Sequence, residues 1–116
     1  MKYAEAKVVA ENWLVQDKQN SLIISGDKGV GKSYLVQELG FQLAWHTVET
    51  FTQAMYTQDV VIVDNAAPSL WNDELRYCLV STAKVIITTI FNADVFIIRP
   101  KKRGLIINLE SIRSFW

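Results

Sequence analysis

The segment SLIISGDKGVGKSYLVQEL, residues 21–39, runs from an apolar stretch through a glycine-rich loop into a stretch of helical character. Its centre, residues 26–33, matches the phosphate-loop pattern G-x-x-x-x-G-K-[ST]. The loop follows a predicted strand (21–25) and opens a predicted helix (32–45), which is the setting that the pattern requires. The segment therefore predicts an α/β fold with a phosphate-binding turn at the end of a strand.

The residue types of this loop suit an anion. Glycines let the backbone turn tightly so that its N–H groups converge, and the start of the following helix adds partial positive charge. We expect Lys32 to bridge the β- and γ-phosphates of ATP and the Ser33 hydroxyl to ligate Mg²⁺. The expected nucleotide-binding residues are Gly26, Asp27, Lys28, Gly29, Val30, Gly31, Lys32, Ser33 and Tyr34. The alternative is a glycine-rich turn that binds nothing.

Hydrophobic patterning predicts the remaining elements. They are helices over 3–16 and 70–80 and strands over 47–51, 60–63, 84–89 and 105–109, with 96–98 as either an extra strand or a loop. Strands that alternate with helical segments predict a three-layer α/β/α sandwich with about five mostly parallel strands. Together with the phosphate-loop motif, this makes the P-loop NTPase fold the expected one. A chain of 116 residues fits one domain, 1–116, in which a nucleotide-binding core over 20–110 follows the first helix.

An acidic residue follows the apolar strand 60–63. We expect this residue, Asp64, to hold Mg²⁺; the alternative is an aspartate that caps the next turn. Asn65 lies where many ATPases carry a glutamate that polarises the attacking water, and an amide can orient water but cannot accept its proton. The sequence therefore favours weak hydrolysis. Two alternatives are a carboxylate from Asp73 or Glu74 that reaches the site, and a switch rather than a motor.

The strand 84–89 ends in two hydroxyl side chains, Thr88 and Thr89. A polar residue at this strand end can lie between the phosphate loop and the acidic strand and sense the γ-phosphate. Of the two we select Thr89 as the candidate catalytic residue, with Asn92 in reserve. The alternative is that threonine is simply common in strands.

One dense basic cluster, RPKKR, spans Arg99–Arg103. Arg103 is a candidate arginine finger for the nucleotide of a neighbouring subunit in a homo-oligomer. The same loop is a candidate contact for nucleic-acid phosphates, and a solvated loop is the third alternative. Twelve basic and twelve acidic side chains cancel over the whole chain, so no overall positive field favours nucleic acid.

Other features bear on the compartment. Cys78 is the single cysteine, which excludes an internal disulfide and suits a reducing cytosol. The first residues lack the apolar core of a signal peptide, and no apolar run is long enough to span a bilayer. We therefore expect a cytoplasmic protein without membrane contact. Trp13, Trp45 and Trp71 are expected to pack in the core or at its edge.

With these motifs in place, the chain resembles the AAA+ class of P-loop NTPases, and within it the DnaA-type initiators and DnaC/IstB-type helicase loaders. The resemblance rests on residues 20–25, GDKGVGKSYLVQELGFQLA, VVIVDNA, KVIITT and residues 99–105. It implies binding of ATP and Mg²⁺, oligomer-dependent hydrolysis, and a role near DNA replication or mobile-element maintenance. The compact core is also similar to that of viral superfamily 3 helicases, which implies a virus- or plasmid-encoded origin.

The sequence departs from the AAA+ pattern at three places. Asn65 replaces the family acid, Ile90 lies where an asparagine often follows the paired threonines, and the helical lid that usually carries a further arginine is not expected after the last strand. Two other functions stay open beside the ATPase. One is a small P-loop kinase, and the other is a non-hydrolysing module whose bound nucleotide controls contact with a protein partner.

Overall fold

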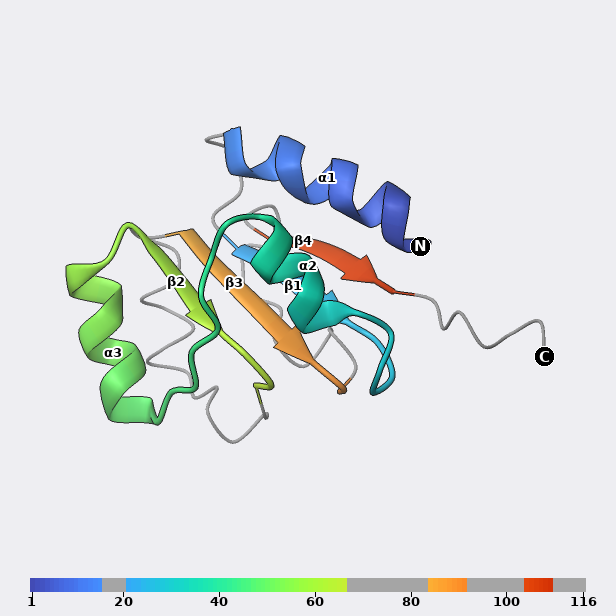
Figure 1. Ribbon diagram of the computed structural model, residues 1–116. Coiled ribbons are helices and arrows are strands. Elements are labelled where there is room, and N and C mark those ends of the chain that lie inside the picture. The colour runs from blue at the N-terminus through green and yellow to red at the C-terminus, as the bar shows by residue number, and fades with distance from the viewer. Residues whose placement is uncertain (16–20, 67–83, 92–103, 110–116) are drawn as a thin grey trace.

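The computed structural model describes residues 1–15, 21–66, 84–91 and 104–109, and these form a mixed α/β fold (Figure 1). The elements in chain order are α1 (Tyr3–Val15), β1 (Ser21–Ser25), α2 (Lys32–Glu38), α3 (Val48–Thr57), β2 (Val60–Val63), β3 (Lys84–Thr89) and β4 (Gly104–Asn108). The predicted helix 3–16 and the predicted strands 21–25, 60–63, 84–89 and 105–109 are confirmed, with end residues that differ by at most one position.

The four described strands form one parallel sheet in the order β2-β3-β1-β4. Leu22 of β1 is paired with Ile86 of β3 on one side and with Leu105 of β4 on the other. Because all four strands run the same way, their carboxyl ends meet at one edge of the sheet (Figure 1). That edge carries the glycine-rich loop after β1, Asp64 after β2 and the end of β3.

The helices α1 and α2 pack on one face of this sheet. Their buried residues are Ala6, Ala10 and Trp13 from α1 and Leu35 and Val36 from α2, and they meet Leu22, Ile24, Ile62, Ile86 and Ile107 of the strands. Tyr3 and Lys7 of α1 also reach α2, where both contact the Glu38 carboxylate. This packing fixes α2, and with it the glycine-rich loop, against the sheet.

The opposite face of the sheet is buried as well. Its side chains Ile23, Val61, Val85 and Ile87 are at most 2% exposed. Burial on both faces explains why these strands are continuously apolar rather than alternating, as the sequence indicated. The helix α3 lies beside β2 (Figure 1), and its Phe51 and Ala54 are buried.

Two sequence-based expectations were wrong in the segment between Lys32 and Thr57. The helix predicted over 32–45 ends at Glu38, because Gly40 adopts a left-handed conformation (φ 96°) and closes the turn through Gln37. The strand predicted over 47–51 is instead the start of α3. Thr47 caps that helix: its hydroxyl accepts the N–H of Thr50, and the Thr50 hydroxyl accepts the N–H of Thr47.

The reciprocal Thr47–Thr50 cap explains the second error. β-Branched residues favour a strand when they are read one by one, whereas a threonine pair three residues apart satisfies the first N–H groups of a helix. The part of the sheet that the structure describes therefore has four strands rather than five. The predicted helix 70–80 and the segment 96–98 lie outside the described residues.

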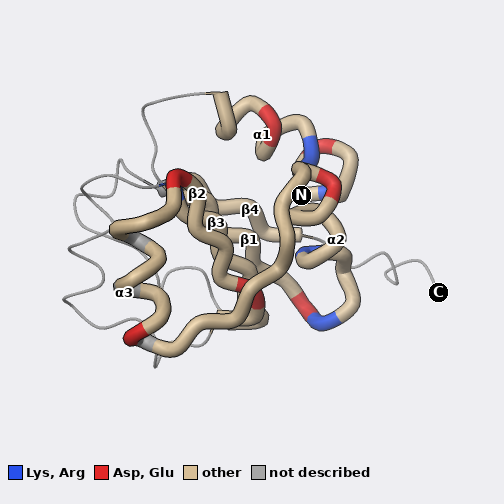
Figure 2. Tube along the Cα trace, turned by 60° about the vertical axis from the view of Figure 1, so that its left-hand side comes forward, with Lys and Arg blue, Asp and Glu red and all other residues tan. Residues whose placement is uncertain are grey.

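Charges of both signs are interspersed over the described residues, and no basic stripe runs along them (Figure 2). Asp27 and Lys28, which carry opposite charges, are adjacent in the glycine-rich loop near the carboxyl edge of the sheet. Among the helices that the structure describes, none has the length and apolar character needed to cross a membrane.

Candidate functional site

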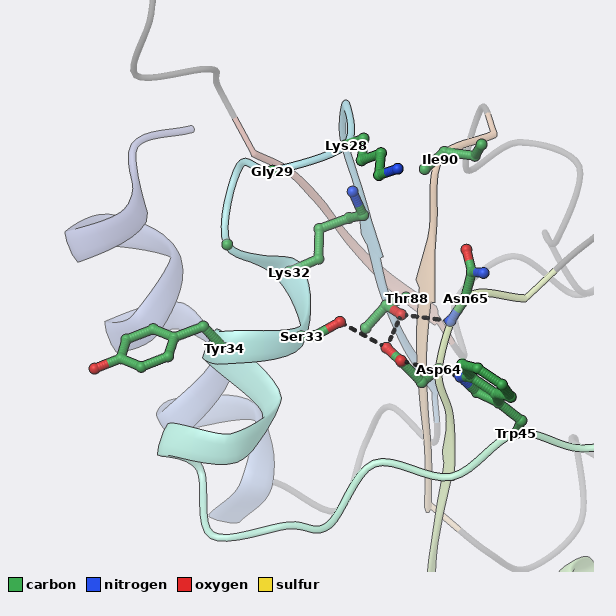
Figure 3. A pocket seen from close by; sticks show the side chains of 11 residues that line it. Lys28, Gly29, Lys32, Ser33, Tyr34, Trp45, Asp64, Asn65, Thr88 and Ile90 are labelled. Atoms are coloured by element: carbon green, nitrogen blue, oxygen red, sulfur yellow. Dashed lines mark hydrogen bonds between the residues drawn. The ribbon is translucent and has the colours of Figure 1, made fainter.

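A pocket of about 610 Å³ opens at the carboxyl edge of the sheet (Figure 3). Side chains and backbone from the glycine-rich loop, the α2–α3 connector and the ends of β2 and β3 line it. The lining residues are Lys28, Gly29, Gly31, Lys32, Ser33, Tyr34, Trp45, Asp64, Asn65, Thr88 and Ile90. Most of the sequence-predicted site residues therefore meet in one place.

Two glycines of the loop are required by its geometry. A Cβ on Gly26 would lie 2.9 Å from the carbonyl oxygen of Leu109, so no larger residue fits without a backbone shift. Gly31 has φ 102°, a left-handed conformation that L-residues rarely adopt, and it is the residue before the first turn of α2. The loop thus turns from β1 into α2 with a close backbone approach at Gly26 and a left-handed conformation at Gly31, and glycine meets both requirements.

The Lys32 ammonium group folds back over the loop. Its Nζ donates to the backbone oxygen of Gly26 at 2.8 Å and to that of Asp27 at 2.7 Å. Partial burial lowers the pKa of Lys32, and the nearby charges of Asp27 and Asp64 oppose that shift. The loop thus holds a cation on neutral carbonyl groups, which are weaker acceptors for it than an anion would be.

Asp64 is the centre of a hydrogen-bond cluster built from three segments. Its Oδ1 accepts from the Ser33 hydroxyl at 2.9 Å and from the Thr88 hydroxyl at 2.7 Å. The Thr88 oxygen in turn accepts the backbone N–H of Asn65 at 2.8 Å. These bonds connect the first turn of α2, the end of β2 and the end of β3, and they point the carboxylate toward the loop (Figure 3).

Thr88, and not Thr89, lies in the pocket. Successive side chains of a strand point to opposite faces, so only one of the two threonines can face Asp64. Thr89 is fully buried, donates to the Ala66 carbonyl at 2.8 Å and accepts from the Phe91 N–H at 3.1 Å. The structure therefore places Thr88, and not the selected Thr89, beside Asp64 in the pocket.

Asn65 adopts a left-handed conformation with φ 55°. Asparagine is one of the few non-glycine residues that are enriched there, because its short side chain tolerates the conformation. The residue type at this position thus meets a need of the backbone. Its carboxamide still borders the pocket (Figure 3), where it can donate or accept a hydrogen bond.

Trp45 is a pocket residue that the sequence did not reveal. Its Nε1 donates to Oδ2 of Asp64 at 3.4 Å, and its side chain is 80% exposed. The sequence placed it on a helix over 32–45, where core or edge packing would account for it. Gly40 was the available signal, since glycine commonly follows the last turn of a helix and would have put Trp45 in a connector.

The other predicted site residues support the loop or lie elsewhere. Gly26 and Asp27 hold Lys32 through their carbonyls, and Val30 is buried beneath the loop. The Tyr34 ring points away from Asp64 (Figure 3) and lies 6.0 Å, between centroids, from the ring of Tyr3. Four candidates lie outside the described residues: Asp73, Glu74, Asn92 and Arg103, the last with the rest of the 99–103 cluster.

The oxygen atoms of the pocket suit a hard metal cation that takes only a few of its ligands from the protein. Ser33 supplies a hydroxyl and Asp64 a carboxylate at 2.9 Å from it. Within the described ranges there is no group of three or more His, Cys, Asp or Glu side chains that could hold a metal by themselves. Mg²⁺ typically takes one or two carboxylates and completes its octahedron with phosphate oxygens and water.

Comparison with known proteins finds no family model that matches the chain and no curated protein with significant similarity to it.

Proposed function

We propose that this chain binds ATP with Mg²⁺ in the pocket at the carboxyl edge of its sheet, as a P-loop NTPase with a three-layer core of the AAA+ type. The observation that carries the proposal is the meeting of Lys32, Ser33, Asp64 and Thr88 in one pocket. These four residues come from three separate parts of the sequence. Binding of phosphate and metal needs a cation, a hydroxyl and a carboxylate in one place, and the pocket contains all of these groups.

The geometry of Lys32 supports phosphate binding. Its ammonium group now donates to two neutral carbonyls of its own loop. A phosphate oxygen carries negative charge and forms a stronger bond to an ammonium group than a carbonyl does. We expect Lys32 to exchange these two carbonyl contacts for β- and γ-phosphate oxygens when ATP enters.

Ser33 and Asp64 would hold the metal. Both oxygens face the pocket, and Thr88 fixes the carboxylate from the side of β3. When bound there, Mg²⁺ neutralises charge on the β- and γ-phosphates. The order β2-β3-β1 also supports the AAA+ resemblance, because it puts the polar end of β3 between the loop and the acidic strand.

The pocket favours slow turnover. Asn65 borders it with an amide, which cannot accept a proton from water. The Thr88 hydroxyl donates to Asp64 and accepts from Asn65, so it has no second proton to offer a γ-phosphate. We therefore propose a weak or partner-dependent ATPase, with the role in DNA replication or mobile-element maintenance that the resemblance implies.

The carboxylate content of the pocket favours a second candidate function. Asp64 is the one carboxylate among the described lining residues of the pocket, and it is placed for metal binding rather than for activating water. A protein built this way can bind ATP tightly without turnover and use the bound nucleotide to control contact with a protein partner. A small kinase has less support, since nothing in the described pocket provides a separate acceptor site.

The experiment is calorimetric titration of the protein with ATP at millimolar Mg²⁺. Loss of the Lys32 charge-assisted bonds in Lys32→Ala should weaken binding by roughly 10- to 100-fold. Lys2→Ala, which removes an exposed lysine outside the pocket, is the matched control and should bind as the parent does. Equal affinity of the parent and Lys32→Ala would refute nucleotide binding at this site.

Incubation with γ-labelled ATP then separates the functions. Slow phosphate release that single-stranded DNA or a partner accelerates supports the ATPase. Binding without release under every condition supports the nucleotide-controlled module. Transfer of label to a small acceptor would instead support the kinase.

A further inference from the structure

The α2–α3 connector is bonded to the end of β2 at two adjacent residues. The backbone N–H of Asp64 donates to the carbonyl of Ala44 at 2.8 Å, and the indole N–H of Trp45 donates to Oδ2 of Asp64 at 3.4 Å. The first bond holds the backbone of Asp64, and the second holds its side chain. Residues 44–45 therefore act on the same aspartate that faces Ser33.

The two oxygens of the Asp64 carboxylate have different partners. Oδ1 accepts from the hydroxyls of Ser33 and Thr88, which point it into the pocket. Oδ2 accepts from Trp45, and from no other described residue. The χ2 angle of an aspartate, which describes rotation about its Cβ–Cγ bond, has a broad distribution. A carboxylate that is held at one oxygen alone can therefore still rotate. The bond to Trp45 fixes the second oxygen and thereby the plane of the carboxylate.

We infer that Trp45 is a positioning residue for Asp64: its indole N–H holds Oδ2 so that Oδ1 stays directed at the Ser33 hydroxyl, where the metal-binding edge of the pocket lies. This inference rests on the proposed function for the identity of the cation, Mg²⁺ in the nucleotide complex. The geometry of the carboxylate itself does not depend on that identity.

Packing does not explain Trp45. Its side chain is 80% exposed, so little of its large apolar surface is removed from water. An indole is a donor only, and this donor meets the side chain that the site requires. At 3.4 Å the bond is longer, and therefore weaker, than the two bonds to Oδ1. The fixed part of the residue is its N–H, and the ring remains open to solvent.

The test uses Trp45→Phe, which keeps an aromatic ring and removes the donor. ATP affinity is measured over a Mg²⁺ series and again in EDTA. We expect the Mg²⁺ concentration for half-maximal ATP binding to rise by about three- to tenfold, the loss of one weak hydrogen bond to a charged group. ATP affinity in EDTA should equal that of the parent, because in the proposed complex the loop, and not Trp45, contacts the phosphates.

Two further variants separate the donor from the ring. Trp45→His restores a ring N–H at this position and should recover part of the Mg²⁺ response. Tyr56→Ala trims another exposed aromatic residue, one that lies outside the lining of the pocket, and should leave the Mg²⁺ response unchanged. A normal Mg²⁺ response in Trp45→Phe would overturn the inference, as would equal losses with and without Mg²⁺.

A second measurement requires no nucleotide. In a ¹⁵N-labelled protein, the indole N–H resonance of Trp45 is assigned by its absence in Trp45→Phe. We expect that resonance to shift toward the position of a solvent-exposed tryptophan in Asp64→Ala, and to keep its place in Lys32→Ala. An unchanged resonance in Asp64→Ala would refute the contact, whatever the protein binds. Absence of ATP binding in the parent would instead refute the proposed function, and the resonance would still decide the role of Trp45.

Discussion

The Thr88 hydroxyl donates to Oδ1 of Asp64 at 2.7 Å, and the Thr88 hydroxyl oxygen also accepts the backbone N–H of Asn65. One threonine at the end of β3 therefore holds both residues that follow β2. Its neighbour Thr89 makes its bonds on the other side of the strand, to Ala66 and Phe91. Two adjacent residues of the same type thus serve the pocket and the protein core separately.

This difference predicts opposite patterns in two valine variants. Thr88→Val and Thr89→Val should each lower the free energy of unfolding by about 1–3 kcal/mol, because each leaves hydrogen-bonding groups without a partner. Only Thr88→Val should also weaken Mg²⁺-dependent ATP binding, since only Thr88 touches Asp64. Urea unfolding measures the first effect and calorimetry the second. Loss of ATP binding in Thr89→Val under conditions where the variant is still folded would contradict this assignment.

The sequence does not show which face of β3 each of these two threonine side chains lies on. The apolar run that ends in Thr88-Thr89 predicted β3 correctly, because buried strands are recognised by composition and length. It did not fix which threonine faces the pocket, since both faces of β3 are buried and no polar alternation marks them. The loop and Asp64 were predictable because each needs a particular residue type at a strand end.

The position of Trp45 was missed for a different reason. The segment after α2 has helical composition, and only the left-handed turn at Gly40 ends the helix. The reciprocal cap of Thr47 and Thr50 then starts α3 where β-branched residues favoured a strand. The turn at Gly40 and the Thr47–Thr50 cap thus override the average secondary-structure propensity of residues 39–51. Trp45 lies in the connector between them, at the pocket.

Alanine variants at three glycines should distinguish backbone strain alone from backbone strain combined with steric conflict. Gly31 and Gly40 both have left-handed φ values, 102° and 96°, so alanine should cost about 1–2 kcal/mol of stability at each. Gly26→Ala should cost more, because its Cβ would meet the Leu109 carbonyl at 2.9 Å. Thermal and urea unfolding measure these differences.

Gly40 provides the matched control for the function of the loop. It shares the backbone strain of Gly31 but lies outside the lining of the pocket. Gly31→Ala and Gly26→Ala should therefore weaken ATP binding, whereas Gly40→Ala should bind ATP normally once folded. A similar loss of binding in all three variants would mean that global destabilisation, and not the shape of the loop, is responsible.

The pKa of Lys32 predicts a dependence of stability on pH. Burial lowers this pKa below the ordinary value of 10.5, so the folded protein binds the Lys32 proton less tightly than the unfolded chain does. Between the lowered value and 10.5 the unfolded chain binds more protons, and stability therefore rises with pH across that window. Lys32→Met lacks this contribution.

The measurement is urea unfolding of the parent and Lys32→Met from neutral pH to about pH 10. We expect the stability of the parent to increase relative to that of Lys32→Met as the pH rises. Parallel pH profiles would show that Lys32 titrates normally in the folded protein, and a relative decrease would mean that the two carbonyl bonds outweigh the effect of burial.

Asn65 connects backbone conformation with turnover, and two substitutions separate these roles. Asn65→Gly fits the left-handed φ of 55° and should keep or slightly raise the stability of the protein. Asn65→Glu should lower it by about 1–2 kcal/mol, because a longer side chain tolerates this conformation less well. The glutamate brings a carboxylate to the pocket, however, and a carboxylate can accept a proton from water.

If the missing base limits turnover, Asn65→Glu should release phosphate faster than the parent in a single-turnover experiment, in spite of its lower stability. A gain of about 10²-fold or more is the usual contribution of a positioned general base. Asn65→Gly removes the amide without adding a base, so it is the control and should not gain activity. No increase in Asn65→Glu, at ATP affinity equal to that of the parent, would favour the nucleotide-controlled module over the slow ATPase.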